Sequence, residues 1–89
     1  MLSKELTIIN RLGLHASAAA KFVNVASSCA SSVQIARNGR SVNGKSIMGV
    51  MMLAAGRGST VQITVDGSDE EQALAKLEQL IADRFGEDE

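Results

Sequence analysis

The 89-residue sequence predicts an α+β fold, a two-layer open-faced sandwich with three helices on one face of a four-stranded, mainly antiparallel sheet. Residues 60–66 alternate apolar and polar side chains, which is typical of a half-buried strand. Asn38 and Gly39 suit a type I′ hairpin turn, because both central positions of that turn need positive φ. Residues 16–27 have the apolar spacing of an amphipathic helix. Together these patterns predict one domain, residues 1–89, with the order β-α-β-β-α-β-α.

The first half of the domain is predicted to contain a strand, a turn and a helix. The strand is expected over residues 4–10, with Leu6 and Ile8 on one face. Gly13 then gives the backbone the freedom to turn. The helix over residues 16–27 is expected to bury a stripe of small and apolar side chains, namely Ala19, Phe22, Val23 and Ala26.

A second helix is predicted between two strand regions. Residues 32–37 and 40–43 form the predicted hairpin, and residues 46–53 follow with Ser46 as the helix N-cap. Apolar residues occupy nearly every position of this short helix, so they cannot all face inward, and a docking surface is expected. The residues expected in the core are Val50, Met52 and Leu53. The residues expected to be exposed for partner contacts are Ile47, Met48 and Met51.

The last helix is predicted to begin with a capping box, in which Ser68 is the N-cap and Glu71 reaches back to it. Its expected buried face consists of Ala73, Leu74, Leu77, Leu80 and Ile81, with Phe85 closing the end. Residues 86–89 form an acidic tail, which is expected to be a solvated terminus.

Composition disfavours several classes of function. The formal net charge is −1 and only 2% of residues are aromatic, so the sequence offers neither a basic surface nor stacking platforms for nucleic acid. The single cysteine, Cys29, cannot form an internal disulfide, which suits a reducing compartment. With no apparent signal peptide and no apolar segment of spanning length, we expect a cytoplasmic protein without membrane insertion, and a monomer by default.

His15 is the only histidine, and it stands immediately before the first predicted helix. The unpaired N–H groups and partial positive charge of a helix start favour an anion there, so an imidazole at this point is a candidate phosphoryl acceptor. The alternative is a surface histidine or a simple cap. With one histidine, one cysteine and no nearby carboxylate, the sequence forms neither a catalytic triad nor a metal site. We therefore expect a protein that is not an enzyme and needs no metal or cofactor.

Two motifs carry a family resemblance. Residues 13–16, Gly-Leu-His-Ala, followed by Ala-Ala-Lys-Phe-Val at 19–23, resemble the active-site motif of the HPr family, the histidine phosphocarriers of the bacterial phosphoenolpyruvate-dependent phosphotransferase system. Residues 44–51 resemble the second signature of that family, around a regulatory serine. The resemblance covers essentially the whole chain. Residues 52–58 and the acidic end are most similar to the nitrogen-related branch, NPr.

The resemblance implies that Nδ1 of His15 accepts a phosphoryl group from Enzyme I, or its nitrogen-related paralogue, and passes it to a IIA protein. Ala16, Ser17 and Arg57 are the predicted phosphate-binding residues. However, Ser17 stands where the family has an arginine. Either Arg57 or Arg11 reaches the site instead, or transfer is slower, or histidine transfer has lost its importance.

The resemblance also gives Ser46 a second interpretation besides helix capping. In relatives with the same motif, a bifunctional HPr kinase/phosphorylase modifies this serine. The alternative function is therefore a regulatory interaction module that acts through Ser46, with His15 transfer impaired. Lys21 is a predicted partner contact beside the exposed residues of the second helix. The basic residues expected to surround His15 are Arg11, Lys21, Lys45 and Arg57.

Overall fold

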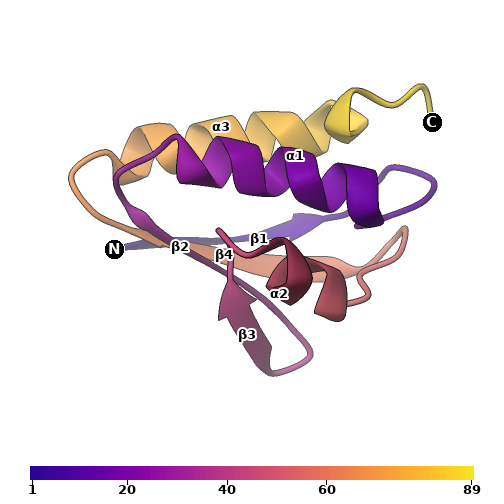
Figure 1. Ribbon diagram of the computed structural model, residues 1–89, viewed down its shortest axis with the longest axis horizontal. Helices are drawn as coiled ribbons and strands as arrows, with labels where there is room; N and C mark the ends of the chain where they lie inside the picture. Colours follow the sequence, from indigo (N-terminus) through magenta and orange to yellow (C-terminus); the bar gives the residue numbers. More distant parts are fainter.

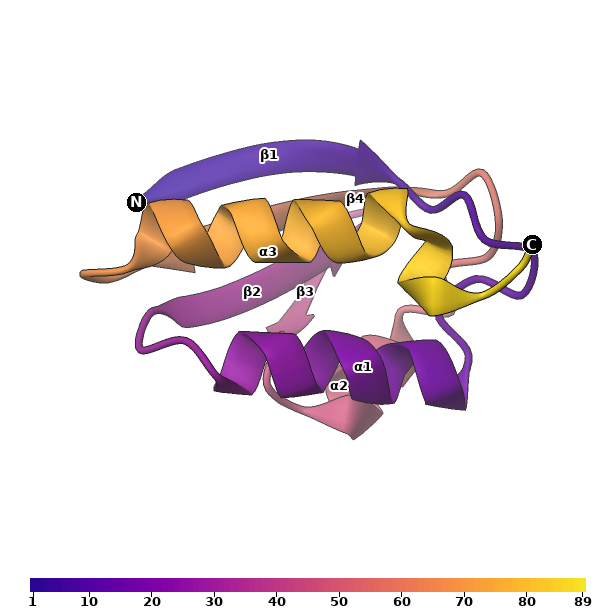
Figure 2. The same cartoon turned by 90° about the horizontal axis from the view of Figure 1, so that it is seen from above.

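The computed structural model describes residues 1–89 and confirms the predicted fold class. An open four-stranded sheet forms one layer, and the helices cover one of its faces (Figures 1 and 2). The strands are β1 (Leu2–Thr7), β2 (Ser32–Arg37), β3 (Arg40–Asn43) and β4 (Thr60–Asp66). The helices are α1 (Ala16–Ser27), α2 (Ile47–Met52), α3 (Glu70–Ala82) and the 3₁₀ turn η1 (Arg84–Gly86).

The sheet has the order β1-β4-β2-β3, and each neighbouring pair is antiparallel. The last strand therefore lies between the first and second, which brings segments distant in sequence together. Asn38 and Gly39 both have positive φ, at 52° and 81°, as the predicted hairpin turn between β2 and β3 requires. The helical crossovers return along the same face, so α1 and α3 lie beside each other above the sheet (Figure 2).

The core lies between the helices and the sheet. Both aromatic residues, Phe22 and Phe85, are fully buried there, and the predicted stripe of α1 is buried with them. The inward residues of β4 are Val61, Ile63 and Val65, all fully buried. On α3 the buried positions are Ala73, Leu77 and Ile81, whereas Leu74 and Leu80 are partly buried.

The first strand begins and ends earlier than predicted. It pairs with β4 from Leu2, opposite Val65, to Thr7, opposite Thr60, so the length of its partner limits it. Ile8 follows the strand and is fully buried, while Ile9 is exposed as the backbone leaves the sheet. The predicted strand over residues 4–10 is therefore wrong at both ends.

The prediction that Met52 faces the core is wrong, because its side chain is 59% exposed. Val50 and Leu53 are buried as predicted. Residues two apart on a helix point in nearly opposite directions, so burying Val50 directs Met52 outward. The exposed residues of α2 are Ile47, Met48, Met51 and Met52.

The predicted capping box of α3 is also wrong. The helix begins at Glu70, and its N-cap is Asp69, whose side chain makes no capping bond. The Asp69 carboxylate instead accepts hydrogen bonds from the Ala30 and Ser31 amides, at 2.8 and 2.9 Å, and from the Ser31 hydroxyl. These donors, led by the hydroxyl, lower the pKa of Asp69 to about 2. Asp69 thus fastens the start of α3 to the loop after α1.

Membrane-spanning segments require longer and more apolar helices than any found in this structure.

Candidate functional site

A tight turn places His15 at the start of α1. Gly13 has a φ of +67°, and the Leu14 amide donates to the Ala55 carbonyl at 2.9 Å. A side chain at position 13 would collide with the Ala55 carbonyl oxygen and approach Gly56. Glycine is thus required both by the backbone conformation and by the close approach of this loop. His15 itself is extended, at φ −71° and ψ 177°, and is the N-cap of α1.

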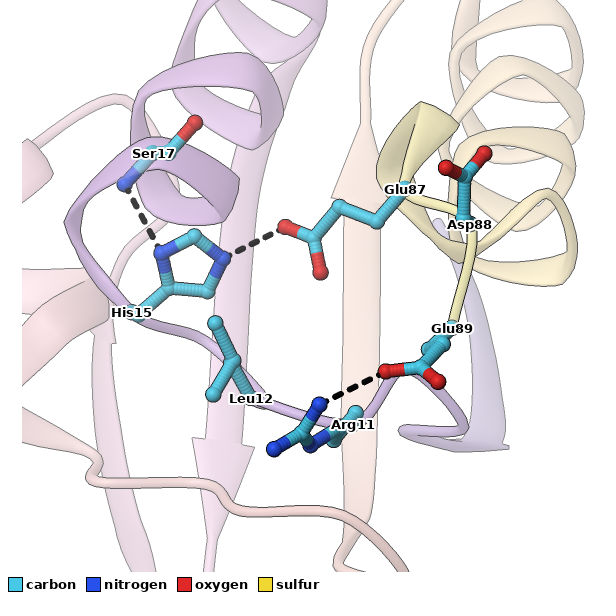
Figure 3. Close-up of a pocket in the computed structure, with 7 residues that line it drawn as sticks. All are labelled: Arg11, Leu12, His15, Ser17, Glu87, Asp88 and Glu89. Carbon is cyan, nitrogen blue, oxygen red and sulfur yellow. Dashed lines mark hydrogen bonds and ion pairs between the residues drawn. The ribbon is translucent and has the colours of Figure 1, made fainter.

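The two ring nitrogens of His15 face different groups (Figure 3). Nδ1 accepts from the Ser17 amide at 3.3 Å, and Nε2 lies 2.5 Å from a carboxylate oxygen of Glu87. A ring nitrogen that accepts a hydrogen bond from an N–H group carries no proton of its own. A ring nitrogen that faces a carboxylate is favoured to carry the proton, which it donates to the carboxylate. The contacts therefore favour the neutral tautomer with the proton on Nε2 and the lone pair on Nδ1.

The acidic end of the chain folds back onto this site, so the prediction of a solvated tail is wrong. Arg84, Phe85 and Gly86 all have positive φ, between 54° and 75°, and this left-handed stretch reverses the chain after α3. Phe85 is buried, and its carbonyl accepts from Nζ of Lys21 at 2.7 Å. The expectation that no carboxylate lies near His15 is wrong for the same reason.

Asn10 links the turn to the tail. Its side chain is fully buried, and Nδ2 donates to the Gly13 carbonyl at 2.8 Å and to Glu87 at 3.0 Å. These contacts keep Glu87 ionised: the hydrogen bonds from Asn10 and then from His15 lower the pKa of its carboxyl group. The Glu87 side chain is 21% exposed and that of His15 30%, so the pair is partly shielded from solvent.

His15 lies in a shallow depression whose other lining residues are Arg11, Leu12, Ser17, Glu87, Asp88 and Glu89. Arg11 pairs with Glu89 through Nη1 at 2.7 Å, and the Arg11 amide donates to the Glu89 carbonyl (Figure 3). Arg57 is absent from this lining and lies in a neighbouring depression with Arg11, Arg84 and Glu89. The structure therefore brings Arg11 together with His15, and Arg57 only as far as the adjoining surface.

The other predicted residues lie at varying positions around this site. Ala16 and Ser17 form the exposed first turn of α1. Lys21 lies one turn further on and contacts η1, as described above. Lys45 is at the opposite end of α1, where Nζ donates to the Cys29 carbonyl at 2.9 Å, so the expected basic surround does not include it.

Ser46 caps α2 as predicted, and its Oγ accepts from the Gly49 amide at 3.1 Å. Helix α2 packs against α1 (Figures 1 and 2). The segment that follows α2 supplies the Ala55 carbonyl, which accepts from the Leu14 amide in the turn before His15. The exposed side chains Ile47, Met48 and Met51 are thus on a helix physically joined to the histidine site.

Sequence reasoning missed Glu87 and Asn10. The acidic tail was visible, but nothing local indicated its destination, because Glu87 is 72 residues from His15 along the chain. Asn10 gave one weak signal, a polar residue directly before a turn.

Comparison with known proteins places this geometry in a family. The family described as "PTS HPr component phosphorylation site" matches residues 2–83. The phosphocarrier protein HPr of Cupriavidus necator is 58% identical over 89 residues, the full length of both chains.

Solved structures agree with this match. HPr-C-His from Thermoanaerobacter tengcongensis is 40% identical, with a TM-score of 0.96 over the whole of both chains. The catabolite repression protein Crh of Bacillus subtilis, described as a swapped-domain dimer, is 37% identical, with a TM-score of 0.76 over 94% of this chain and 97% of its own.

The Cupriavidus necator relative is named a phosphocarrier protein, which agrees with the prediction that this chain is a phosphocarrier and not an enzyme in itself. The nitrogen-related branch remains a prediction. The chain belongs to the HPr family of phosphocarrier proteins of the phosphotransferase system.

Proposed function

We propose that His15 carries the phosphoryl group, which it receives from Enzyme I and passes to a IIA protein. The observation that carries this proposal is that the two ring nitrogens of His15 face different groups. Nδ1 faces the first turn of α1 with its lone pair, while Nε2 is held by Glu87. A nucleophilic nitrogen directed at the backbone N–H groups of a helix start places the phosphoryl acceptor next to groups that bind anions.

Two groups support a phosphoryl group on Nδ1. The amides at the start of α1, including that of Ser17, can donate to phosphoryl oxygens, and the helix dipole adds on the order of 0.3–1 kcal/mol. The missing family arginine would have supplied a charge-assisted bond worth roughly 1.5–3 kcal/mol. Arg11 is the better substitute of the two considered, because it shares the depression with His15 and Arg57 does not.

Partner proteins would dock on the surface formed by α2 and the start of α1. Met48 is 73% exposed, and Ile47 and Met51 are exposed beside it. Methionine side chains adapt to different surfaces, which suits a carrier that must fit both a donor and an acceptor. Lys21 adds a positive charge on α1 for acidic partners.

Replacing His15 with Ala tests the carrier proposal. With Enzyme I and labelled phosphoenolpyruvate, the wild-type protein should acquire label, and the variant should acquire none while keeping its circular dichroism spectrum. Ser46→Ala is the matched control and should label normally. Labelling of the folded His15→Ala protein at the wild-type level would refute His15 as the acceptor.

We infer a second, regulatory role for Ser46, favoured by its partly exposed hydroxyl next to the docking residues of α2. A phosphate there would add about −1.5 to −2 charges and repel an acidic partner. HPr kinase/phosphorylase should modify the wild-type protein but not Ser46→Ala, and modification should slow acceptance at His15. If His15 accepts no label yet Ser46 is modified, the chain is instead a regulatory module acting through Ser46.

We further propose that residues 1–89 work as one domain, as a monomer, in the cytoplasm. Relatives that form dimers make the assembly state worth measuring. Sedimentation equilibrium at micromolar concentration should give the mass of a single chain of 9.3 kDa, whereas twice that mass would contradict the proposal.

A further inference from the structure

We propose that Glu87 is a positioning residue for phosphoryl transfer: its carboxylate holds the His15 ring with the proton on Nε2 and pairs with the positive charge that the ring gains. The proposal rests on the proposed function of His15. It starts from a line of three groups, in which a carboxylate faces one ring nitrogen and the first turn of a helix faces the other (Figure 3).

The carboxylate is itself fixed in place. One oxygen of Glu87 accepts from the buried Asn10 side chain, which also binds the Gly13 carbonyl within the turn before His15. The other oxygen contacts Nε2. The left-handed turn at η1 and the buried Phe85 ring hold the chain just before Glu87. Turn, ring and tail are therefore parts of one connected arrangement, unlike a flexible surface ion pair.

The contact between Glu87 and Nε2 would stabilise the ring during phosphoryl transfer. The Nδ1 lone pair attacks phosphorus, the bond between phosphorus and the donor atom of Enzyme I breaks, and its electron pair remains on the donor. His15 now carries a phosphoryl group on Nδ1 and still has its proton on Nε2, so the ring has gained a positive charge. The Glu87 carboxylate lies beside that charge.

The same contact serves the next transfer. When a nucleophile of the IIA protein attacks the phosphorus, the Nδ1–phosphorus bond breaks and its electrons return to the ring, which becomes neutral again. The proton stays on Nε2 throughout, so no proton has to move in either direction. A carboxylate that orients an imidazole and stabilises its charged form plays a comparable part in the Ser-His-Asp triad.

Glu87→Gln and Asp83→Asn form a matched pair for the test. Each removes one negative charge from the segment after α3, but only Glu87 contacts the ring (Figure 3). Asp83 is exposed, makes no side-chain capping bond and lies outside the depression that holds His15. The rate of phosphorylation by limiting Enzyme I should fall roughly 10- to 100-fold in Glu87→Gln, the scale on which loss of an outer-shell partner of histidine acts at metal sites. In Asp83→Asn it should change by less than about twofold.

A second readout is independent of transfer. In long-range ¹H–¹⁵N spectra of the unphosphorylated wild-type protein, Nε2 should carry the proton, and that proton should exchange slowly with water. Glu87→Gln should weaken this protection, whereas Asp83→Asn should preserve it. Glu87→Asp, which keeps the charge on a shorter side chain, should recover part of the rate.

Three outcomes would overturn the proposal: a wild-type rate in folded Glu87→Gln, equal slowing in both charge variants, or a wild-type ring proton on Nδ1. Equal slowing would show that only the overall charge of the segment after α3 matters. Failure of the proposed function looks different, since the wild-type protein would then accept no phosphoryl group while its ring spectrum could still show the Nε2 proton held by Glu87.

Discussion

At the scale of single residues, the proposed carrier role of His15 depends on which charged groups can approach a phosphoryl group there. Ser17 contributes only its amide and hydroxyl, so the positive charge must come from elsewhere. Arg11 is close enough to line the same depression, and Glu89 currently pairs with its guanidinium. A phosphoryl group on His15 would compete with Glu89 for that guanidinium, which would keep the affinity for phosphate moderate.

Arg11→Ala should therefore slow phosphorylation of His15 by roughly tenfold, because a charge-assisted bond of about 1.5–3 kcal/mol is lost and part of it is recovered by solvent and backbone. Arg57→Ala is the matched control and should have a much smaller effect. Adding Ser17→Arg to the Arg11→Ala protein should restore the rate. Initial rates with limiting Enzyme I measure all three, and equal effects of the two alanine substitutions would refute the special position of Arg11.

At the scale of elements, two loops determine where α1 begins and how its far end is held. The turn before His15 is closed by Gly13 against Ala55, which ties the start of α1 to the segment after α2. Beyond the other end of α1, Asp69 binds the amides of Ala30 and Ser31 and so ties the helix to α3. Both ends of the helix that carries His15 are thus fixed by long-range contacts.

Gly13→Ala should destabilise the protein by about 1–3 kcal/mol and slow transfer at His15, because alanine disfavours positive φ and its Cβ would collide with Ala55. Gly56→Ala is a suitable control, since a Cβ there meets nothing within 4 Å. Urea unfolding gives the free energies. Equal stability of the two variants would show that the turn before His15 is not constrained as described.

Asp69→Asn should lower the thermal midpoint at neutral pH, because the amide cannot accept all three hydrogen bonds that the carboxylate accepts. The pKa of Asp69 is lowered from 3.8 to about 2. The ionised carboxylate therefore contributes its full stabilisation of the folded state above pH 3.8, and this stabilisation is lost as the pH falls towards 2. The difference between wild type and variant should shrink over that range.

Glu71→Gln, on the exposed side of α3, is the control for this pH series and should follow the wild-type protein. Thermal unfolding followed by circular dichroism provides the measurement. A difference between wild type and Asp69→Asn that persists unchanged at pH 2 would contradict the role assigned to the carboxylate.

At the scale of the whole molecule, sequence patterns predicted whatever depends on local periodicity. The bounds of α1, β2, β3 and β4 agree with prediction because each has a clear repeat or a turn signal at its end. Met52 was misplaced because a six-residue helix of almost wholly apolar residues has no polar face to orient it. The predicted capping box was wrong because Asp69, and not Ser68, is the N-cap of α3. The Asp69 carboxylate accepts from the loop at Ser31, which is 38 residues away and leaves no local sequence signal.

The candidate site was predicted in part. His15, Ser17 and the helix start could be identified from one short motif, because they are neighbours in sequence. Glu87 and Asn10 could not, since their roles depend on a left-handed reversal after α3 that places the tail over the histidine. The composition of the tail shows that it is acidic, but it does not show which residues the tail contacts.

Intact mass measurement of the purified protein, incubated with Enzyme I and phosphoenolpyruvate, tests most directly whether His15 carries a phosphoryl group. We expect the mass of one phosphoryl group to be added and then lost after mild acid, as phosphohistidine is acid-labile and phosphoserine is not. No added mass, with an Enzyme I that phosphorylates another HPr protein in parallel, would contradict the carrier function. An acid-stable gain would direct attention to Ser46 instead.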